Sequence, residues 1–408
     1  MSQILVDRAH NARVKLERLI AQVGVVAGGE YPNYDSKLAV DELRARLEKM
    51  VRRLADYGTY PAQLQMSLLR QANYYMIRTT DLLGFITRST STRNLFELYH
   101  PFKMIANKTI GDNARLILSS DWQYSPFTYP YGLDELPNYI MIGLPASESE
   151  NALVFPTAGH ELGHNIWRAC SFDERVKLDV ENAVYEAFEG QRSRFELIFS
   201  LKGADVRNDM FVQPIIRKSV SLALRQTEEL FCDFIGLCLF GRSYLLAFDY
   251  LLAPSLGGHR GGEYPDTRTR VAYLARYAVE MGIEADGFED RFVSEKPSGV
   301  KATDFTVEMA DLAVSTRVQE TFLLARTHVN SKMHPCLTSD GEAHAIECFA
   351  RGIPSARLLS LGDLINAAWS VYCDEQKNSA LSGQGVSLVP FLTDLVIKSA
   401  EIHEFKSL

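Results

Sequence analysis

The sequence predicts an α+β protein that is predominantly helical, with one small sheet between helical segments. Apolar residues recur at helical spacing near both ends of the 408-residue chain. Two short runs, 114–119 and 138–144, are strand-like by their length and by their β-branched and aromatic content. The composition, 46% hydrophobic and 23% charged, is typical of a globular protein that buries a core.

Residues 1–110 are expected to form an N-terminal helical domain. The helices are expected at 11–22, 35–57 and 62–83, where apolar residues share one face. Asp35 or Ser36 can cap the second of these helices.

A central domain is expected over residues 111–285, and a C-terminal helical domain over 300–408, with a polar linker between them. The central domain holds the two strands, an irregular segment at 121–137 and a glycine-rich loop at 255–269. Its helices are expected at 157–170, 173–201, 213–240 and 270–281. The C-terminal helices are expected at 307–323, 361–373 and 390–405.

Charge, cysteine content and hydropathy indicate which classes of partner and which cellular compartment to expect. The net charge of −8 lacks the basic footprint of a nucleic-acid-binding protein. Six sparse cysteines without a CxxC pair indicate a reducing compartment, and a cytoplasmic location is expected. The apolar stretch 234–254 is interrupted by Arg242 and Asp249, so it is interpreted as two buried helical pieces with no membrane partner.

One helix carries the strongest chemical pattern. His160, Glu161 and His164 form an HExxH motif. Positions i and i+4 lie one turn apart on the same face of a helix, so both imidazoles can bind one ion. Zinc lowers the pKa of a bound water to about 7, and Glu161 is placed to take the proton of that water as a general base. The alternative is an ordinary helix with surface histidines.

A downstream helix supplies the third expected ligand. Glu229 and Asp233 have ExxxD spacing, whereas Glu228 has Cys232 at the matching position. Two histidines and one carboxylate are a known catalytic zinc set, with a fourth position left open. Asp233 lies one turn after Glu229 and can accept the outer ring N–H of a ligand histidine. Either Glu228 or Glu229 is expected to lie only on a solvated face.

These two motifs resemble those of the gluzincin zinc metallopeptidases. The matching residues are HELGH at 160–164 and EELFCDFIG at 228–236. The resemblance implies a zincin-like core in which His160, His164 and Glu229 are zinc ligands, Glu161 is the general base and acid, and Asp233 is the outer partner. It also implies that the strand at 138–144 is a sheet edge that pairs with an extended peptide, the alternative being a core strand.

The long gap between the motifs is more similar to the CAAX-prenyl-protease branch of that group. Residues 264–270 resemble its downstream His-Pro and Arg element, with Tyr264 in place of His and Arg270 at the Arg. A hydrolase needs a donor for the developing oxyanion. His259, Tyr264 and Arg270 are the candidates, and the alternative is that this glycine-rich loop is a mobile surface segment.

The function expected from the sequence is a Zn²⁺-dependent hydrolase, specifically a metallopeptidase acting on a peptide or protein. Two alternatives stay open: a scaffold or binding protein whose zinc is structural, and a zinc hydrolase of a non-peptide substrate. The open coordination position and Glu161 favour an enzyme. The helical flanks are expected to limit which substrates reach the cleft.

Overall fold

The computed structural model describes residues 3–91, 98–122, 124–129, 135–203, 205–254, 257–333, 339–382 and 387–407. The chain divides into two compact units, the first formed by Met1–Tyr99 and Asn113–Glu150 and the second by His100–Asp112 and Asn151–Leu408. This division does not follow the expected boundaries at 110, 285 and 300. The strands group with the N-terminal helices, and the C-terminal helices group with the HExxH motif.

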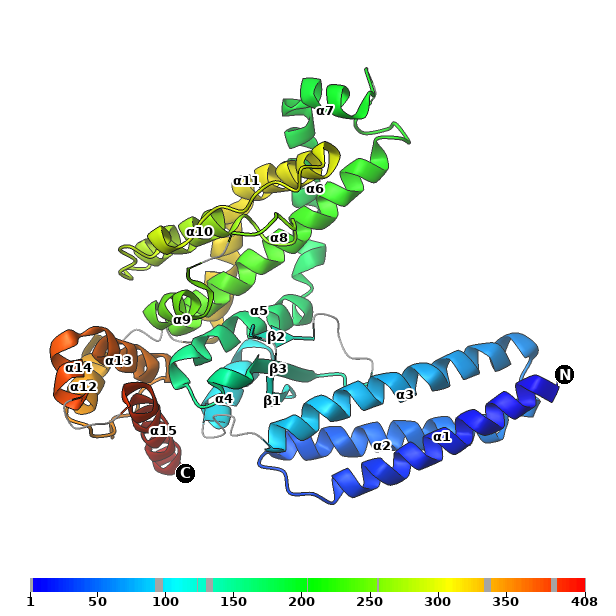
Figure 1. Ribbon diagram of the computed structural model, residues 1–408, viewed down its shortest axis with the longest axis horizontal. Coiled ribbons are helices and arrows are strands. Elements are labelled where there is room, and N and C mark those ends of the chain that lie inside the picture. The colour runs from blue at the N-terminus through cyan, green and yellow to red at the C-terminus, as the bar shows by residue number, and fades with distance from the viewer. Residues whose placement is uncertain are drawn as a thin grey trace. The chain divides into compact units, whose positions relative to one another are not determined.

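Unit 1 begins with three long helices that lie side by side (Figure 1). They are α1 (Gln3–Ala27), α2 (Tyr34–Ala55) and α3 (Ala62–Ser91), and the short 3₁₀ helix η1 (Tyr57–Thr59) follows α2. All three helices were expected. Asn33 is the N-cap of α2, so neither Asp35 nor Ser36 caps it. Asp35 is buried instead and accepts hydrogen bonds from the Tyr99 hydroxyl and the Leu116 N–H.

The described sheet has three strands in the order β1-β3-β2. β1 (Arg115–Asp121) pairs in parallel with β3 (Tyr139–Pro145), and the two-residue β2 (Phe127–Thr128) pairs with β3 antiparallel. β3 is thus the central strand, and all its residues are buried. The expectation that it forms a peptide-binding edge is wrong, because both its neighbours belong to the protein.

The core of unit 1 joins the sheet to the helices. Ile117 and Met141 belong to the same buried cluster as the apolar faces of α1, α2 and α3. Phe127 packs over Gly143, where a Cβ would lie only 2.2 Å from its ring. The short 3₁₀ helix η3 (Ala146–Glu148) follows the sheet.

Unit 2 is helical over the residues that the structure describes. Its elements are α4 (Tyr99–Thr109), η4 (Ala152–Thr157), α5 (Ala158–Ala169), α6 (Phe172–Gly190), α7 (Arg192–Phe199), α8 (Gln213–Phe240), α9 (Arg242–Leu252), α10 (Thr267–Glu280), η5 (Glu289–Arg291), α11 (Lys301–Lys332), α12 (Ser339–Ala350), α13 (Leu361–Cys373), α14 (Glu375–Ser382) and α15 (Leu388–Ser407). The predicted bounds of α8 and α13 are confirmed. The segment 173–201 forms two helices rather than one.

Helix α8 organises this unit by packing against α5, α6 and α11 (Figure 1). Phe234 of α8 contacts Tyr277 of α10 and Phe322 of α11, with ring centroids 5.2 and 5.4 Å apart. Gly241 adopts a φ of 60° and separates α8 from α9, so the apolar stretch 234–254 forms two helical pieces as expected. Among the described helices, none combines the length and apolarity that crossing a bilayer requires.

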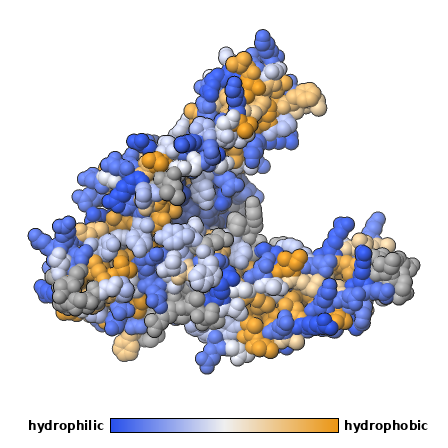
Figure 2. All heavy atoms as spheres, viewed as in Figure 1, coloured by the Kyte–Doolittle hydropathy of each residue, from blue (hydrophilic) through white to orange (hydrophobic). Residues whose placement is uncertain are grey.

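Cysteines and surface residues agree with a globular protein. The cysteines at 170, 232, 238, 348 and 373 form no disulfide, and Cys336 lies outside the described residues. The surface over α1–α3 mixes hydrophilic and hydrophobic residues (Figure 2), among them the exposed Val25 and Ile77. Scattered exposed apolar residues are normal on the surface of a folded protein.

Candidate metal centre

Helices α5 and α8 cross closely because small residues face each other at the contact. Gly159 and Gly163 lie one turn apart on α5, opposite Gly236 and Cys232 of α8. A Cβ on Gly163 would lie 2.7 Å from the Cys232 Cα, and one on Gly159 would lie 3.1 Å from the Gly236 Cα. This close approach brings the side chains of α5 within reach of the carboxylates on α8.

The two histidines of the motif meet Glu229 at this crossing. His160 and His164 are buried, and their ring centroids are 5.0 Å apart. Their Nε2 atoms lie 3.2 and 3.7 Å from the carboxylate oxygens of Glu229. Glu229 has no exposed surface, and neither of its oxygens makes a well-aligned hydrogen bond with the described residues.

The opposite ring nitrogens are held by two other acids of α8. His160 Nδ1 lies 2.8 Å from Asp233 Oδ1, and His164 Nδ1 lies 2.8 Å from Glu228 Oε1. Such contacts orient a ring and select its tautomer. Burial disfavours the charged form of His160, but Asp233 and Glu229 outweigh this effect and raise its pKa to about 10.

One of the two glutamates was expected to lie only on a solvated helix face. Neither does, because Glu228 also takes part in the cluster. Its side chain is 15% exposed and contacts both His164 and Arg225. Neighbouring residues on a helix point about 100° apart. Glu228 and Glu229 reach opposite nitrogens of the same ring only because α5 crosses α8 at this level.

Asp233 is surrounded by three partners. Arg270 donates two hydrogen bonds to it at 2.6 and 2.7 Å, and the Tyr244 hydroxyl donates another at 2.7 Å. Burial alone would raise the pKa of Asp233, but Arg270 and His160 hold it below its usual range. The carboxylate is thus kept charged next to Nδ1 of His160.

The Nε and Nη2 groups of Arg270 are thus engaged by Asp233, and its expected role as an oxyanion donor stays a prediction. Its guanidinium lies against Asp233 and over the rings of Phe248 and Tyr264, with the carbon 5.1 and 4.9 Å from their centroids. In this position it supports the acid that holds His160.

Glu161 is buried on α5 beside the cluster. Burial raises its pKa, and the charges of His160 and His164 act in the opposite direction. A carboxyl group with a raised pKa is suited to taking up and releasing a proton near neutral pH.

The glycine-rich loop holds two further candidates for the oxyanion donor, Tyr264 and His259. Of these, only Tyr264 lies near the cluster. Partial burial, followed by the charge of Glu229, raises the pKa of Tyr264 to about 12, and its ring lies under Arg270. His259 is exposed, and its Nδ1 lies 3.0 Å from the Pro297 carbonyl oxygen. No described contact connects His259 with the cluster, so its expected role is not supported.

Two residues that no motif indicated, Arg225 and Tyr244, also contact the acids of the cluster. Arg225 Nη2 lies 2.6 Å from Glu229 Oε1, and its Nη1 lies 3.0 Å from Glu228 Oε2. Arg225 precedes Glu229 by one helical turn, which is the only sequence pattern that points to it. Tyr244 lies on another helix, and no motif indicates it.

Cys232 also offers a ligand atom. Its sulfur and one ring nitrogen each from His160 and His164 lie within 4.8 Å of one another, so this buried group could hold a metal ion. Burial and the charge of Glu229 raise the thiol pKa well above its ordinary value. A metal ligand must be deprotonated, so the thiol would release its proton on binding an ion.

Comparison of the chain with protein-family models, curated proteins and solved structures finds no match. The resemblance to gluzincins consequently stays an expectation from the sequence motifs alone.

Proposed function

We propose that this chain is a zinc-dependent hydrolase that cleaves peptide bonds. His160, His164 and Glu229 hold the ion, Glu161 is the general base and acid, and Tyr264 stabilises the developing oxyanion. The observation that carries the proposal is the orientation of the two imidazoles. Their Nε2 atoms point to one buried carboxylate, while their Nδ1 atoms are engaged by Asp233 and Glu228.

The donor set fits a zinc ion. Two imidazoles and a carboxylate are used by catalytic zinc sites. A buried carboxylate is costly unless it is paired or coordinates a metal. Glu229 is fully buried, and its oxygens have ion-pair contacts but no well-aligned hydrogen bond among the described residues. A cation between Glu229 and the two rings would satisfy those oxygens.

Glu229 is a better third ligand than Cys232. Burial raises the pKa of Glu229, but the close contact and charge of His160, with the charges of His164 and Arg225, outweigh this effect and lower the pKa, so the carboxylate stays ionised. The Cys232 sulfur instead packs at the helix crossing, 3.1 Å from where a Gly163 Cβ would lie.

The protein residues have separate tasks in the reaction. A bound zinc ion supplies Lewis-acid activation of water and of the substrate carbonyl. Glu161 accepts the proton of the attacking water and later donates it to the leaving amine. The Tyr264 hydroxyl, with its pKa raised to about 12, stays protonated and donates to the oxygen that gains charge. Asp233 and Glu228 keep both rings in place.

The deep burial of the histidines favours a second candidate, in which the zinc is structural. Glu161 argues against it, because a structural site needs no buried acid beside its ligands. The same residues also suit a non-peptide substrate, since the activated water would be the same. A peptide hydroxamate that inhibits more strongly than acetohydroxamate would favour the peptide substrate, because both chelate zinc and only the first has a peptide backbone.

The test measures zinc content and turnover of internally quenched peptides on purified full-length chain. We expect Glu161→Gln to keep its zinc and lose at least 100-fold in turnover, in line with general base catalysis. His160→Ala loses both, and Glu186→Gln, an exposed acid of α6, loses neither. An active Glu161→Gln protein would remove the proposed base. Zinc with no turnover in the wild type would support the structural alternative.

A further inference from the structure

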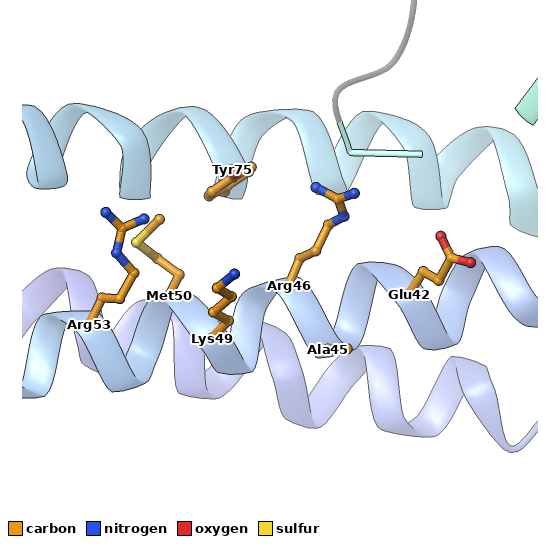
Figure 3. Close-up of a pocket in the computed structure, with 7 residues that line it drawn as sticks. All are labelled: Glu42, Ala45, Arg46, Lys49, Met50, Arg53 and Tyr75. Atoms are coloured by element: carbon orange, nitrogen blue, oxygen red, sulfur yellow. The ribbon is translucent and has the colours of Figure 1, made fainter. Parts of the chain in front are cut away.

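A second candidate site is a groove in unit 1. Its residues belong to helices α2 and α3, far in sequence from the metal centre. This groove of about 420 Å³ runs along α2 and is closed on one side by Tyr75 of α3. Figure 3 shows Arg46, Lys49, Arg53 and Met50 extending from α2 toward α3. The groove therefore combines three cationic side chains with the ring of Tyr75 and the largely buried Met50.

The cations of the groove are not neutralised by the acids of their own helix. Among the described residues, each acid of α2 is engaged elsewhere. Asp35 accepts from Tyr99 and Leu116, Asp41 pairs with Lys37, Glu42 pairs with Arg115, and Glu48 pairs with Arg44. Glu42 also lines the groove, but its carboxylate is held by Arg115 at the start of β1.

Arg46 and Lys49 have no described ion pair, and Arg53 donates to the neutral side chain of Gln71 at 2.9 Å. Three positive charges thus face one groove of a chain whose net charge is −8. No sequence motif points to this group, although positions 46, 49 and 53 have the i, i+3 and i+7 spacing of one helix face.

We propose that this groove binds a linear oligophosphate group, either free or carried on a small molecule. The helix rises about 1.5 Å per residue, so residues 46, 49 and 53 extend over about 10 Å. A row of cations of that length suits several successive phosphate groups. A space of about 420 Å³ is also in the range of small-ligand sites. Nucleic acid fits less well, because the net charge of the whole chain is −8 and long polyanions are bound by extended basic surfaces rather than by a groove of this size.

The test titrates the full chain with inorganic tripolyphosphate by calorimetry in 0.1 M salt. We expect saturable binding that is at least tenfold tighter than that of orthophosphate. The double variant Arg46→Ala/Lys49→Ala should weaken it at least tenfold. Arg52→Ala is the matched control, because Arg52 is exposed on the same helix but does not line the groove. It should change the affinity less than twofold.

Two further measurements complete the test. One asks whether a nucleoside attached to the phosphates adds affinity, and the other whether tripolyphosphate binds by chelating zinc at the metal centre. Adenosine triphosphate that binds more tightly than tripolyphosphate, with the gain lost in Tyr75→Ala, would show a nucleoside carrier. Equal affinities would show that the oligophosphate alone is recognised. His160→Ala should bind tripolyphosphate as the wild type does, because its groove is unchanged.

Three results would overturn the proposal: no saturable binding, an equal loss in Arg52→Ala, or tighter binding of a single-stranded oligonucleotide that the double variant abolishes. Circular dichroism and thermal melting establish that each variant is folded. The proposal is independent of the hydrolase, since an inactive chain that binds tripolyphosphate would leave it standing.

Discussion

His160 and Asp233 meet through a 2.8 Å contact between Nδ1 and Oδ1, although 73 positions separate them in the sequence. The contact joins α5 to α8 and connects the histidine to Arg270 and Tyr244. The orientation of one expected metal ligand therefore depends on residues from three other helices.

The first prediction concerns the third zinc ligand. Glu229→Ala should reduce the zinc content of the chain to a small fraction, because it removes a direct ligand. Glu228→Ala should weaken zinc affinity about 10- to 100-fold, as expected for the loss of an outer partner of a histidine. Cys232→Ser should change it least. Competition with a fluorescent chelator measures all three affinities, and a greater loss in Cys232→Ser would assign the ligand to the thiol.

The second prediction concerns the helix crossing. Gly163→Ala should lower the free energy of unfolding by about 1–3 kcal/mol, because the new Cβ meets the Cys232 backbone and overpacking carries that cost. Gly190→Ala is the control, since a Cβ there meets nothing within 4 Å. Urea unfolding monitored by circular dichroism measures both variants, and equal stability of the two would contradict the tight crossing.

The third prediction concerns the ion pair between Asp233 and Arg270, next to His160. Asp233→Asn should destabilise the fold by about 3–5 kcal/mol, because it leaves the buried Arg270 without a counter-ion. The surface pair of Asp179 with Arg317 offers a comparison, and Asp179→Asn should cost no more than about 1 kcal/mol. Thermal unfolding distinguishes them, and a mild effect at Asp233 would show that the pair contributes little.

The fourth prediction separates the two donors of the glycine-rich loop. Tyr264→Phe should lower kcat about 100-fold with little change in KM, because the hydroxyl acts on charge that develops only in the transition state. His259→Ala should leave both constants near those of the wild type, since His259 faces Pro297. Steady-state kinetics on a cleaved peptide decide between them, and the reverse result would restore His259 as the donor.

Periodicity alone predicted most of the described helices, but not α4, α12 or α14, and not the division into two units. The bounds of α8 and α13 were predicted, as were the existence of β1 and β3 and the break between α8 and α9. Local apolar spacing and glycine positions determine these features, so they are visible without any knowledge of distant contacts. The short β2 was not predicted, because two residues carry too little pattern.

The sequence by itself also determined which helices carry His160, His164, Glu161 and Glu229, since a one-turn spacing places side chains on a shared face. Only the tertiary structure decided that Glu228 holds His164, that Arg270 is engaged by Asp233, and that β3 lies in the middle of its sheet. Each of these depends on where two segments cross, and a crossing is set by side-chain packing between residues remote in the chain.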